Sequence, residues 1–94
     1  MKFPIIQVPF ALGQTVATPN VLNSVPREEI LAALQRHQNC DWGDVCAQDK
    51  WSNDRAVKCG DRLFSVYHSN EGIKFWIITE ADRSATTVLL PPDY

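Results

Sequence analysis

The chain has 94 residues, of which 45% are hydrophobic and 21% are charged. These proportions are typical of a folded protein and exclude an intrinsically disordered chain. Nine basic and eleven acidic residues leave a formal net charge of −2 with no long run of either sign, so the bulk charge attracts neither nucleic acid nor membrane lipids. We therefore expect a single domain over residues 1–94. We expect it to bind neither nucleic acid directly nor a membrane.

The N-terminal segment and the cysteines bear on localisation. Residues 1–10 carry one positive charge and an apolar run interrupted by two prolines, which is too short and too kinked for the helical part of a signal peptide. Three cysteines, Cys40, Cys46 and Cys59, cannot all form disulfides within one chain, so a reducing compartment is the simpler assumption. The sequence therefore predicts a cytoplasmic protein.

The first elements after this segment are a weak strand and two helices. Residues 10–17 have weak strand character, and Thr18 followed by Pro19 is typical of a capped helix of one turn. A second helix opens at residues 24–26, with two glutamates in its first turn. Its last turn holds Arg36 and His37, and this charge order stabilises a helix dipole.

A third helix is predicted from Val45 to about Cys59, with Asp44 as its N-cap and Gly60 as its left-handed C-cap. One face of this helix is unusual, because it places polar groups in line with small apolar ones. That face contains Cys46, Asp49, Asn53, Ala56 and Val57. It either meets the core with its polar groups bonded to backbone or lines a site.

The rest of the chain predicts a β-meander of residues 62–68, 73–79 and 85–90, with pairing ended by Pro91-Pro92. The middle strand is apolar on both faces, because Trp76 and Ile78 alternate with Phe75 and Ile77. We expect Leu63 and Tyr67 to lie with Trp76 on the second face. The cover of that face is either residues 3–10 or another protein.

Two groups of residues could carry chemistry. His37 and the three cysteines contain the ligand atoms of a zinc site, but their spacing matches no common zinc motif, so free thiols are the simpler interpretation. Asp49, Asn53 and Asp54 could hold a divalent ion as in a metal-dependent nuclease. The structural alternative is a network that ties this helix to the turn around Trp42.

Other residues favour a contact surface. The loop after the middle strand contains Glu80, Asp82 and Arg83, which can form hydrogen bonds within the turn or contact a partner. Tryptophan is enriched in interface hot spots, although in small domains it is more often part of the core. We therefore select six candidate partner-binding residues and no cofactor: Trp42, Asp44, Trp76, Glu80, Asp82 and Arg83.

Four segments carry a family resemblance: LGQTVATPNVL, CDWGD, GDRLFSVY and KFWIITEADRSATTVLLPPDY. They resemble a family of small uncharacterised proteins carried on bacterial plasmids, phages and integrated elements, sometimes loosely labelled type I restriction subunits. The similarity covers about residues 12–94, and the ending TEADRS-TT-LLP is its most specific part. It supplies no catalytic residue, but it implies a setting in which small proteins inhibit host defence by stoichiometric binding.

Taken together, the patterns predict an α+β fold in which an antiparallel sheet of three or four strands packs against two helices on one face. We expect a binding protein that inhibits or modulates a host defence or nucleic-acid-processing complex, as anti-CRISPR or anti-restriction proteins do. The alternatives are a metal-dependent nuclease or nuclease accessory, using the acidic residues above, and a homo-oligomeric structural protein such as a homodimer.

Overall fold

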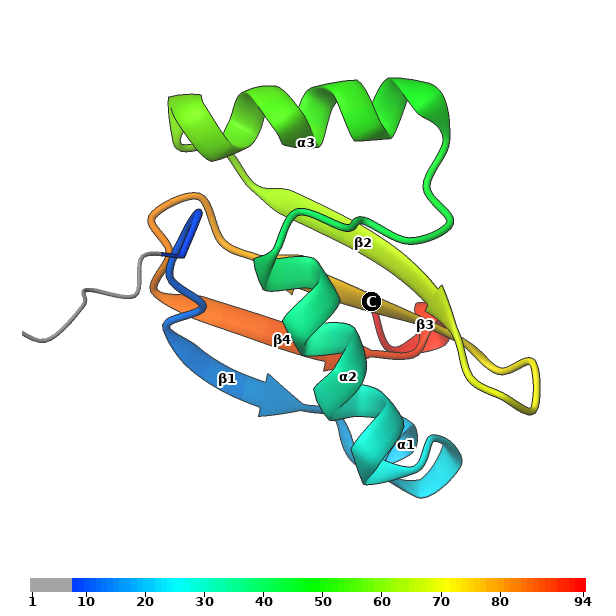
Figure 1. Ribbon diagram of the computed structural model, residues 1–94. Helices are drawn as coiled ribbons and strands as arrows, with labels where there is room; N and C mark the ends of the chain where they lie inside the picture. The colour runs from blue at the N-terminus through cyan, green and yellow to red at the C-terminus, as the bar shows by residue number, and fades with distance from the viewer. Residues whose placement is uncertain (1–7) are drawn as a thin grey trace, which may run out of the picture.

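The computed structural model describes residues 8–94 and has the α+β architecture expected from the sequence (Figure 1). Helices and strands do not simply alternate, because all three α-helices come between the first strand and the other three. The elements are β1 (Gln14–Ala17), α1 (Pro19–Ser24), α2 (Arg27–Gln38), α3 (Ala47–Cys59), β2 (Leu63–His68), β3 (Lys74–Thr79), β4 (Ala85–Leu89) and the 3-10 helix η1 (Pro91–Asp93).

The sheet has four strands in the order β1-β4-β3-β2. The predicted meander is confirmed, since β2, β3 and β4 pair antiparallel, but β1 pairs parallel with β4 and the sheet is mixed. Gly13 permits this pairing with its φ of 67°, because a Cβ there would lie 2.4 Å from the Arg83 and Ser84 carbonyl oxygens. The chain thus approaches the β3–β4 loop closely, and the Gln14 N–H donates to the Ser84 oxygen at 2.9 Å.

The helix boundaries follow local capping signals, with one difference from the prediction. Thr18 caps α1 by accepting from the Val21 N–H at 3.3 Å, and Gly60 closes α3 with a φ of 79°. The N-cap of α3 is Cys46, whose sulfur accepts from the Asp49 N–H at 3.4 Å. Asp44 lies before the helix and its N–H donates to the Val66 carbonyl instead.

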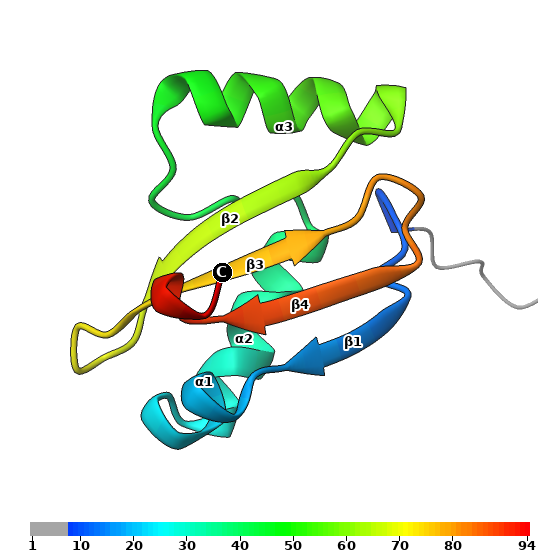
Figure 2. The ribbon, with the colours of Figure 1, turned by 180° about the vertical axis from the view of Figure 1, so that it is seen from behind.

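The two long helices lie in different places relative to the sheet (Figures 1 and 2). Helix α2 crosses one face, which we call the helix side, and packs Ile30 and Ala33 against Phe75, Ile77 and Val88. Helix α3 lies along the outer edge of β2. Its buried residues are Asn53 and Ala56, so it has too little apolar surface to cover a sheet face.

A second cluster joins α3 to the N-terminal segment. Phe10, Trp42, Ala56 and Leu63 are buried together, and the rings of Phe10 and Trp42 stack with centroids 6.1 Å apart. Phe10 therefore packs on the helix side of the sheet. The remainder of the N-terminal cover predicted for the second face, residues 3–7, lies outside the described residues. Within residues 8–94, no helix has the length and apolar character needed to span a bilayer.

Candidate protein-docking surface

The sheet face opposite α2 is built from alternate residues of the meander. In the register of β2 and β3, Phe64 lies opposite Ile78 and Val66 opposite Trp76, and residues directly opposite each other share a face. Phe64 and Val66 are therefore the neighbours of Trp76 and Ile78. The expectation that Leu63 and Tyr67 lie there was wrong, because both are buried on the helix side.

Aromatic side chains from three elements meet on this face. The ring of Trp76 lies edge-on to Phe64, with centroids 5.1 Å apart, and edge-on to Tyr94, with centroids 5.9 Å apart. Figure 2 shows that the short C-terminal helix η1 leads the chain back over this side of the sheet. A hollow of about 170 Å³ lies among these rings, lined by Arg62, Phe64, Trp76, Ile78 and Tyr94.

Arg62 connects two other residues at the edge of this hollow, Tyr94 and Glu80. Its Nη1 donates to the Tyr94 hydroxyl at 2.7 Å, and its guanidinium carbon lies 5.3 Å from the centroid of the same ring. Its Nε lies 4.0 Å from Glu80 Oε1. Both side chains of this ion pair are about half exposed, so the pair contributes little stability. It leaves the hollow bordered by one charge of each sign.

The indole nitrogen of Trp76 has no hydrogen-bond acceptor among the described residues. The Nε1 atom is nevertheless buried. A buried donor left without an acceptor costs roughly 1–3 kcal/mol. The aromatic cluster therefore contains a buried donor that makes no hydrogen bond to the described residues.

A second hollow lies beside α3. It has a volume of about 300 Å³ and shares Arg62 with the first hollow. On its border Trp51 is 60% exposed, and the Arg55 guanidinium lies 4.9 Å from the Trp51 ring centroid. We call the combined region the aromatic surface. Its members are Trp51, Arg55, Arg62, Phe64, Trp76 and Tyr94.

Two of the six predicted contact residues belong to this region or its border, namely Trp76 and Glu80. Trp42 does not, because it is only 3% exposed and its indole N–H donates to Asp54 at 2.9 Å. Asp44 is exposed beside His68, with 2.7 Å between Oδ2 and the ring Nδ1. Asp82 accepts from the Ser84 N–H at 3.0 Å, and hydrogen bonds from Ser84 lower the pKa of this carboxyl group.

Arg83, the last of the six, has a structural role. Its backbone adopts a φ of 62°. Its guanidinium donates to the carbonyl oxygens of Asp61 at 2.6 Å and Ala56 at 2.8 Å, and so binds the C-terminal end of α3 to the β3–β4 loop. A side chain whose donors are already used by backbone carbonyls has little left for a partner.

The acidic residues proposed for a nuclease do not converge. Asp49 is exposed, whereas Asn53 is 4% exposed and binds the backbone of Phe64. Asp54 accepts from Trp42 and from Lys50 Nζ at 3.0 Å, and these hydrogen bonds lower the pKa of its carboxyl group. In residues 8–94, no three His, Cys, Asp or Glu side chains come together as metal ligands.

The four residues considered as zinc ligands, His37 and the three cysteines, lie in different environments. All three cysteines are free thiols, with Cys46 and Cys59 exposed and Cys40 half-buried. Burial raises the pKa of the Cys40 thiol, which makes it a poorer thiolate donor. The fourth candidate ligand, His37, is completely buried between α2 and the sheet.

His37 belongs to a chain of hydrogen bonds that crosses the whole sheet. Thr86 Oγ1 donates to the Leu12 carbonyl at 2.6 Å, so its oxygen accepts from Thr79 Oγ1 at 2.8 Å. Thr79 in turn accepts from His37 Nε2 at 2.8 Å, and His37 Nδ1 accepts from Ser65 Oγ at 2.5 Å. This order fixes the Nε2–H tautomer of a neutral imidazole.

Burial, and to a smaller degree the charge of Arg83, lower the pKa of His37 to about 4. The expectation that His37 serves as a charged residue at the end of α2 was therefore wrong, because its ring is desolvated. The Ser65 and His37 pair has the atoms of a nucleophile and a base. Both side chains have no exposed area, so a substrate cannot reach them in this arrangement.

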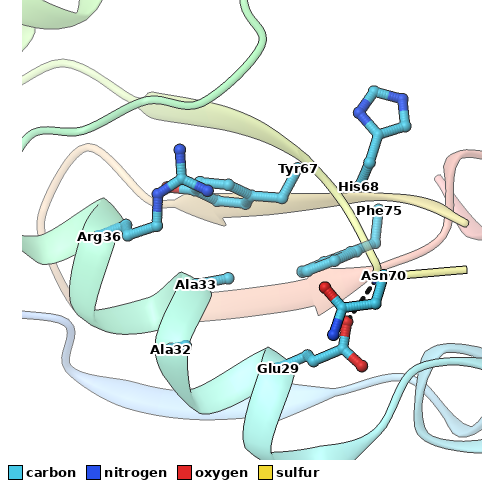
Figure 3. A pocket seen from close by; sticks show the side chains of 8 residues that line it. All are labelled: Glu29, Ala32, Ala33, Arg36, Tyr67, His68, Asn70 and Phe75. Atoms are coloured by element: carbon cyan, nitrogen blue, oxygen red, sulfur yellow. Dashed lines mark hydrogen bonds between the residues drawn. The ribbon is translucent and has the colours of Figure 1, made fainter. Parts of the chain in front are cut away.

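A third hollow, of about 150 Å³, lies between α2 and the ends of β2 and β3 (Figure 3). The Arg36 guanidinium lies over the Tyr67 ring, 4.8 Å from its centroid, and also pairs with Asp41 at 2.8 Å. Glu29 accepts from the Asn70 N–H at 2.7 Å, while the His68 ring points away from the hollow. Its charged groups thus already have partners within the chain, which makes it a weaker candidate than the aromatic surface.

Tyr94, Arg62 and Phe64 were missed as contact residues. The alternation of β2 contained the signal for Phe64. If Leu63 and Tyr67 are assigned to the helix side, the residues between them alternate so that Phe64 lies on the same face as Trp76. The position of Tyr94 had no local signal, since it depends on η1 and on Asp93, which accepts from Thr18 and Asn20 at 2.7 and 2.6 Å.

Comparison of the chain with protein-family models, with curated proteins and with solved structures finds no match. The resemblance of residues 12–94 to a family from mobile elements therefore stays a prediction.

Proposed function

We propose that the chain is a small binding protein of mobile-element origin that inhibits or modulates a host defence or nucleic-acid-processing complex. It acts by stoichiometric protein contact through the aromatic surface. The observation that carries this proposal is the cluster of Trp51, Trp76 and Tyr94 with two arginines around adjoining hollows. Tryptophan, tyrosine and arginine are the residues most enriched in binding hot spots.

The charge of the surface favours a protein over nucleic acid. Arg62 is bordered by Glu80, and Asp61 lines the adjoining hollow, so no purely positive field is available for phosphates. An apolar side chain of a partner that enters the first hollow would lie beside the Arg62 guanidinium and the Glu80 carboxylate at its border.

The inhibitory role and the identity of the target class come from the family resemblance. Small, weakly acidic single-domain proteins from mobile elements are frequently inhibitors or modulators of host defence, and they include anti-restriction and anti-CRISPR proteins. A mechanism by steric blockade needs only a stable surface, and the hydrogen-bonded chain from Ser65 to Leu12 provides rigidity behind it.

The test uses exposed positions, so that loss of binding is not confused with loss of folding. We expect the wild-type chain, expressed in a restriction- or CRISPR-proficient bacterium, to raise the plating efficiency of a targeted phage. The variant Trp51→Ala/Tyr94→Ala should lose most of this protection, since both side chains are at least 60% exposed. Glu71→Ala, in the turn between β2 and β3 and also exposed, is the control and should protect fully.

A pull-down identifies the partner class in the same experiment. Wild-type bait should enrich a protein complex that the double variant does not retain. Full protection by the double variant would exclude the aromatic surface as the contact site. Absence of protection by the wild-type chain against every system tested, with no enriched protein, would reject the proposed function.

A further inference from the structure

Within residues 8–94, the outer edge of strand β1 has no partner. Gln14 N–H donates to the Ser84 oxygen and Thr18 N–H to the Val88 oxygen, at 2.9 and 3.0 Å. In the parallel register with β4, every second residue of β1 therefore directs its backbone toward β4. The N–H and C=O groups of Thr15 and Ala17 point the other way, and no described residue bonds to them. Among the described strands, β1 is the outermost on its side of the sheet (Figures 1 and 2).

This edge also lacks the features that usually prevent strand pairing. Exposed edge strands are commonly blunted by charges, prolines or bulges. Strand β1 has none of these, and no charged residue occurs from Phe10 to Pro26. At its centre, Val16 is 43% exposed.

We propose that β1 pairs antiparallel with β1 of a second copy of this chain, about a two-fold axis that passes beside Val16. The pairing joins two four-stranded sheets into one continuous sheet. This inference does not rest on the proposed function, because the aromatic surface lies toward the opposite edge of the sheet.

The backbone geometry selects one register. The outward groups belong to Thr15 and Ala17, and they are all used within the two strands only when Thr15 faces Ala17 of the second copy and exchanges two N–H···O bonds with it. The two-fold axis repeats the same exchange on the other side. Val16 then faces Val16 of the second copy in a non-hydrogen-bonded pair, in which side chains approach most closely.

The surroundings of β1 favour a second copy over an unrelated strand. The segment carries no charge, so two copies meet without like charges opposing each other. On α2, Glu29 and Arg36 line the hollow on the β2 side, and Gln38 donates to the Phe10 carbonyl on the other side. By helical spacing Leu31 and Leu34 lie on the same flank as Gln38, which contacts the segment that leads into β1.

Exposed apolar area beside the edge supports a stable dimer. A pair of four-residue strands by itself buries less than the roughly 1,200 Å² of a specific interface. Leu31, 56% exposed, and Leu22 on α1, 49% exposed, add apolar surface. A two-fold axis normal to the sheet places both α2 helices on the same side of the joined sheet, with these flanks facing each other.

The first test measures molar mass by light scattering across a dilution series. We expect a dimer for the wild-type chain and a monomer for Val16→Lys, because the substitution opposes two ammonium groups at the axis. The circular dichroism spectrum should not change, since Val16 is exposed. Trp51→Lys, at an apolar residue beside the opposite edge that is 60% exposed against 43% for Val16, should remain dimeric.

The second test reads the register by cross-linking. In a background with Cys40→Asn, Cys46→Ser and Cys59→Ser, Val16→Cys should form a disulfide-linked dimer on mild oxidation. Facing Cα atoms in such a pair lie about 4.5 Å apart, within the range of a disulfide. Gln14→Cys in the same background should remain uncross-linked, because it lies away from the axis.

Three outcomes would overturn the proposal. They are a wild-type monomer at every concentration, a dimer that Val16→Lys leaves intact, and cross-linking of Gln14→Cys as fast as Val16→Cys. A lower mass of the Val16→Lys variant together with a cross-linked Val16→Cys dimer supports it.

Discussion

The two edges of the sheet differ sharply in how their backbone groups are satisfied. At the β2 edge, the Asn53 amide donates to the Phe64 carbonyl at 2.6 Å and accepts from the Phe64 N–H at 3.1 Å. The turn before α3 completes this edge, because Val66 N–H donates to the Trp42 oxygen at 3.1 Å and Asp44 N–H to the Val66 oxygen at 2.8 Å. At the β1 edge, the corresponding groups of Thr15 and Ala17 have no partner in the described part of the chain.

This difference shows that one helix of a small domain can serve mainly to cover the edge of a sheet. Helix α3 contributes little to the main core, but its Asn53 replaces a neighbouring strand for two backbone groups. The β2 edge is thus closed by hydrogen bonds, whereas the β1 edge carries no charged residue. The β1 edge is therefore the one available for association with another strand. The predictions below test each edge and the chain of hydrogen bonds between them.

Removing the amide that closes the β2 edge should have the largest effect. Asn53→Ala leaves the Phe64 N–H and C=O without partners beneath α3, so we expect the free energy of unfolding to fall by about 2–4 kcal/mol. Urea denaturation measures this loss. Ser52→Ala, one residue earlier and exposed, should change stability by less than about 0.5 kcal/mol. Equal effects of the two substitutions would contradict the assigned role of Asn53.

The buried imidazole between the two edges predicts a pH dependence. The pKa of His37 is about 4 in the folded chain and 6.5 for a free histidine, so the unfolded chain binds the extra proton first as the pH falls. The stability that is fully present above about pH 6.5 should therefore be lost between pH 6.5 and 4, by up to about 3 kcal/mol.

Two measurements check this pH dependence. Denaturant unfolding from pH 7 to 4 gives the loss of stability, and NMR titration of the His37 ring gives its pKa and tautomer. A ring that titrates near pH 6.5, or a neutral ring protonated at Nδ1, would contradict the proposed hydrogen-bonded chain.

The Thr86 hydroxyl connects the row of buried hydrogen bonds to the segment that leads into β1. Thr86→Val keeps the shape of the side chain but removes the group that accepts from Thr79 and donates to the Leu12 carbonyl. We expect a loss of about 1–3 kcal/mol in the free energy of unfolding. Because Leu12 leads into β1, hydrogen exchange at the Gln14 amide should accelerate more than exchange at amides of β2. Uniform acceleration across both strands would show that the chain does not anchor β1 specifically.

Much of the fold could be predicted because its signals are local. Thr18 with Pro19, and Gly60 with its positive φ, mark helix ends through neighbouring backbone groups. The meander follows from β-prone runs separated by turns such as that at Gly72. The parallel pairing of β1 could not be predicted, because it depends on the close approach of Gly13 to a loop seventy residues later in the chain.

The candidate site was predicted in part. The two-sided apolar pattern of β3 indicated that Trp76 lies on a face that the helices leave uncovered, and Glu80 lies at its border. Trp42 was wrong because its turn folds between Phe10 and His37, whose rings lie 6.1 and 5.5 Å from it. Sequence alone does not show whether an aromatic residue in a turn faces solvent or fills a gap beside a helix.

The order of the elements, the N-cap of α1, the C-cap of α3 and the two apolar faces of the middle strand followed from the sequence alone. These properties depend on backbone preferences and on hydrogen bonds between residues close in the chain. Only the tertiary structure decided that Asn53 closes one edge, that β1 leaves the other open, and that His37 is buried and neutral. Each of those outcomes requires partners far apart in the sequence to meet with defined geometry, and local patterns do not specify such meetings.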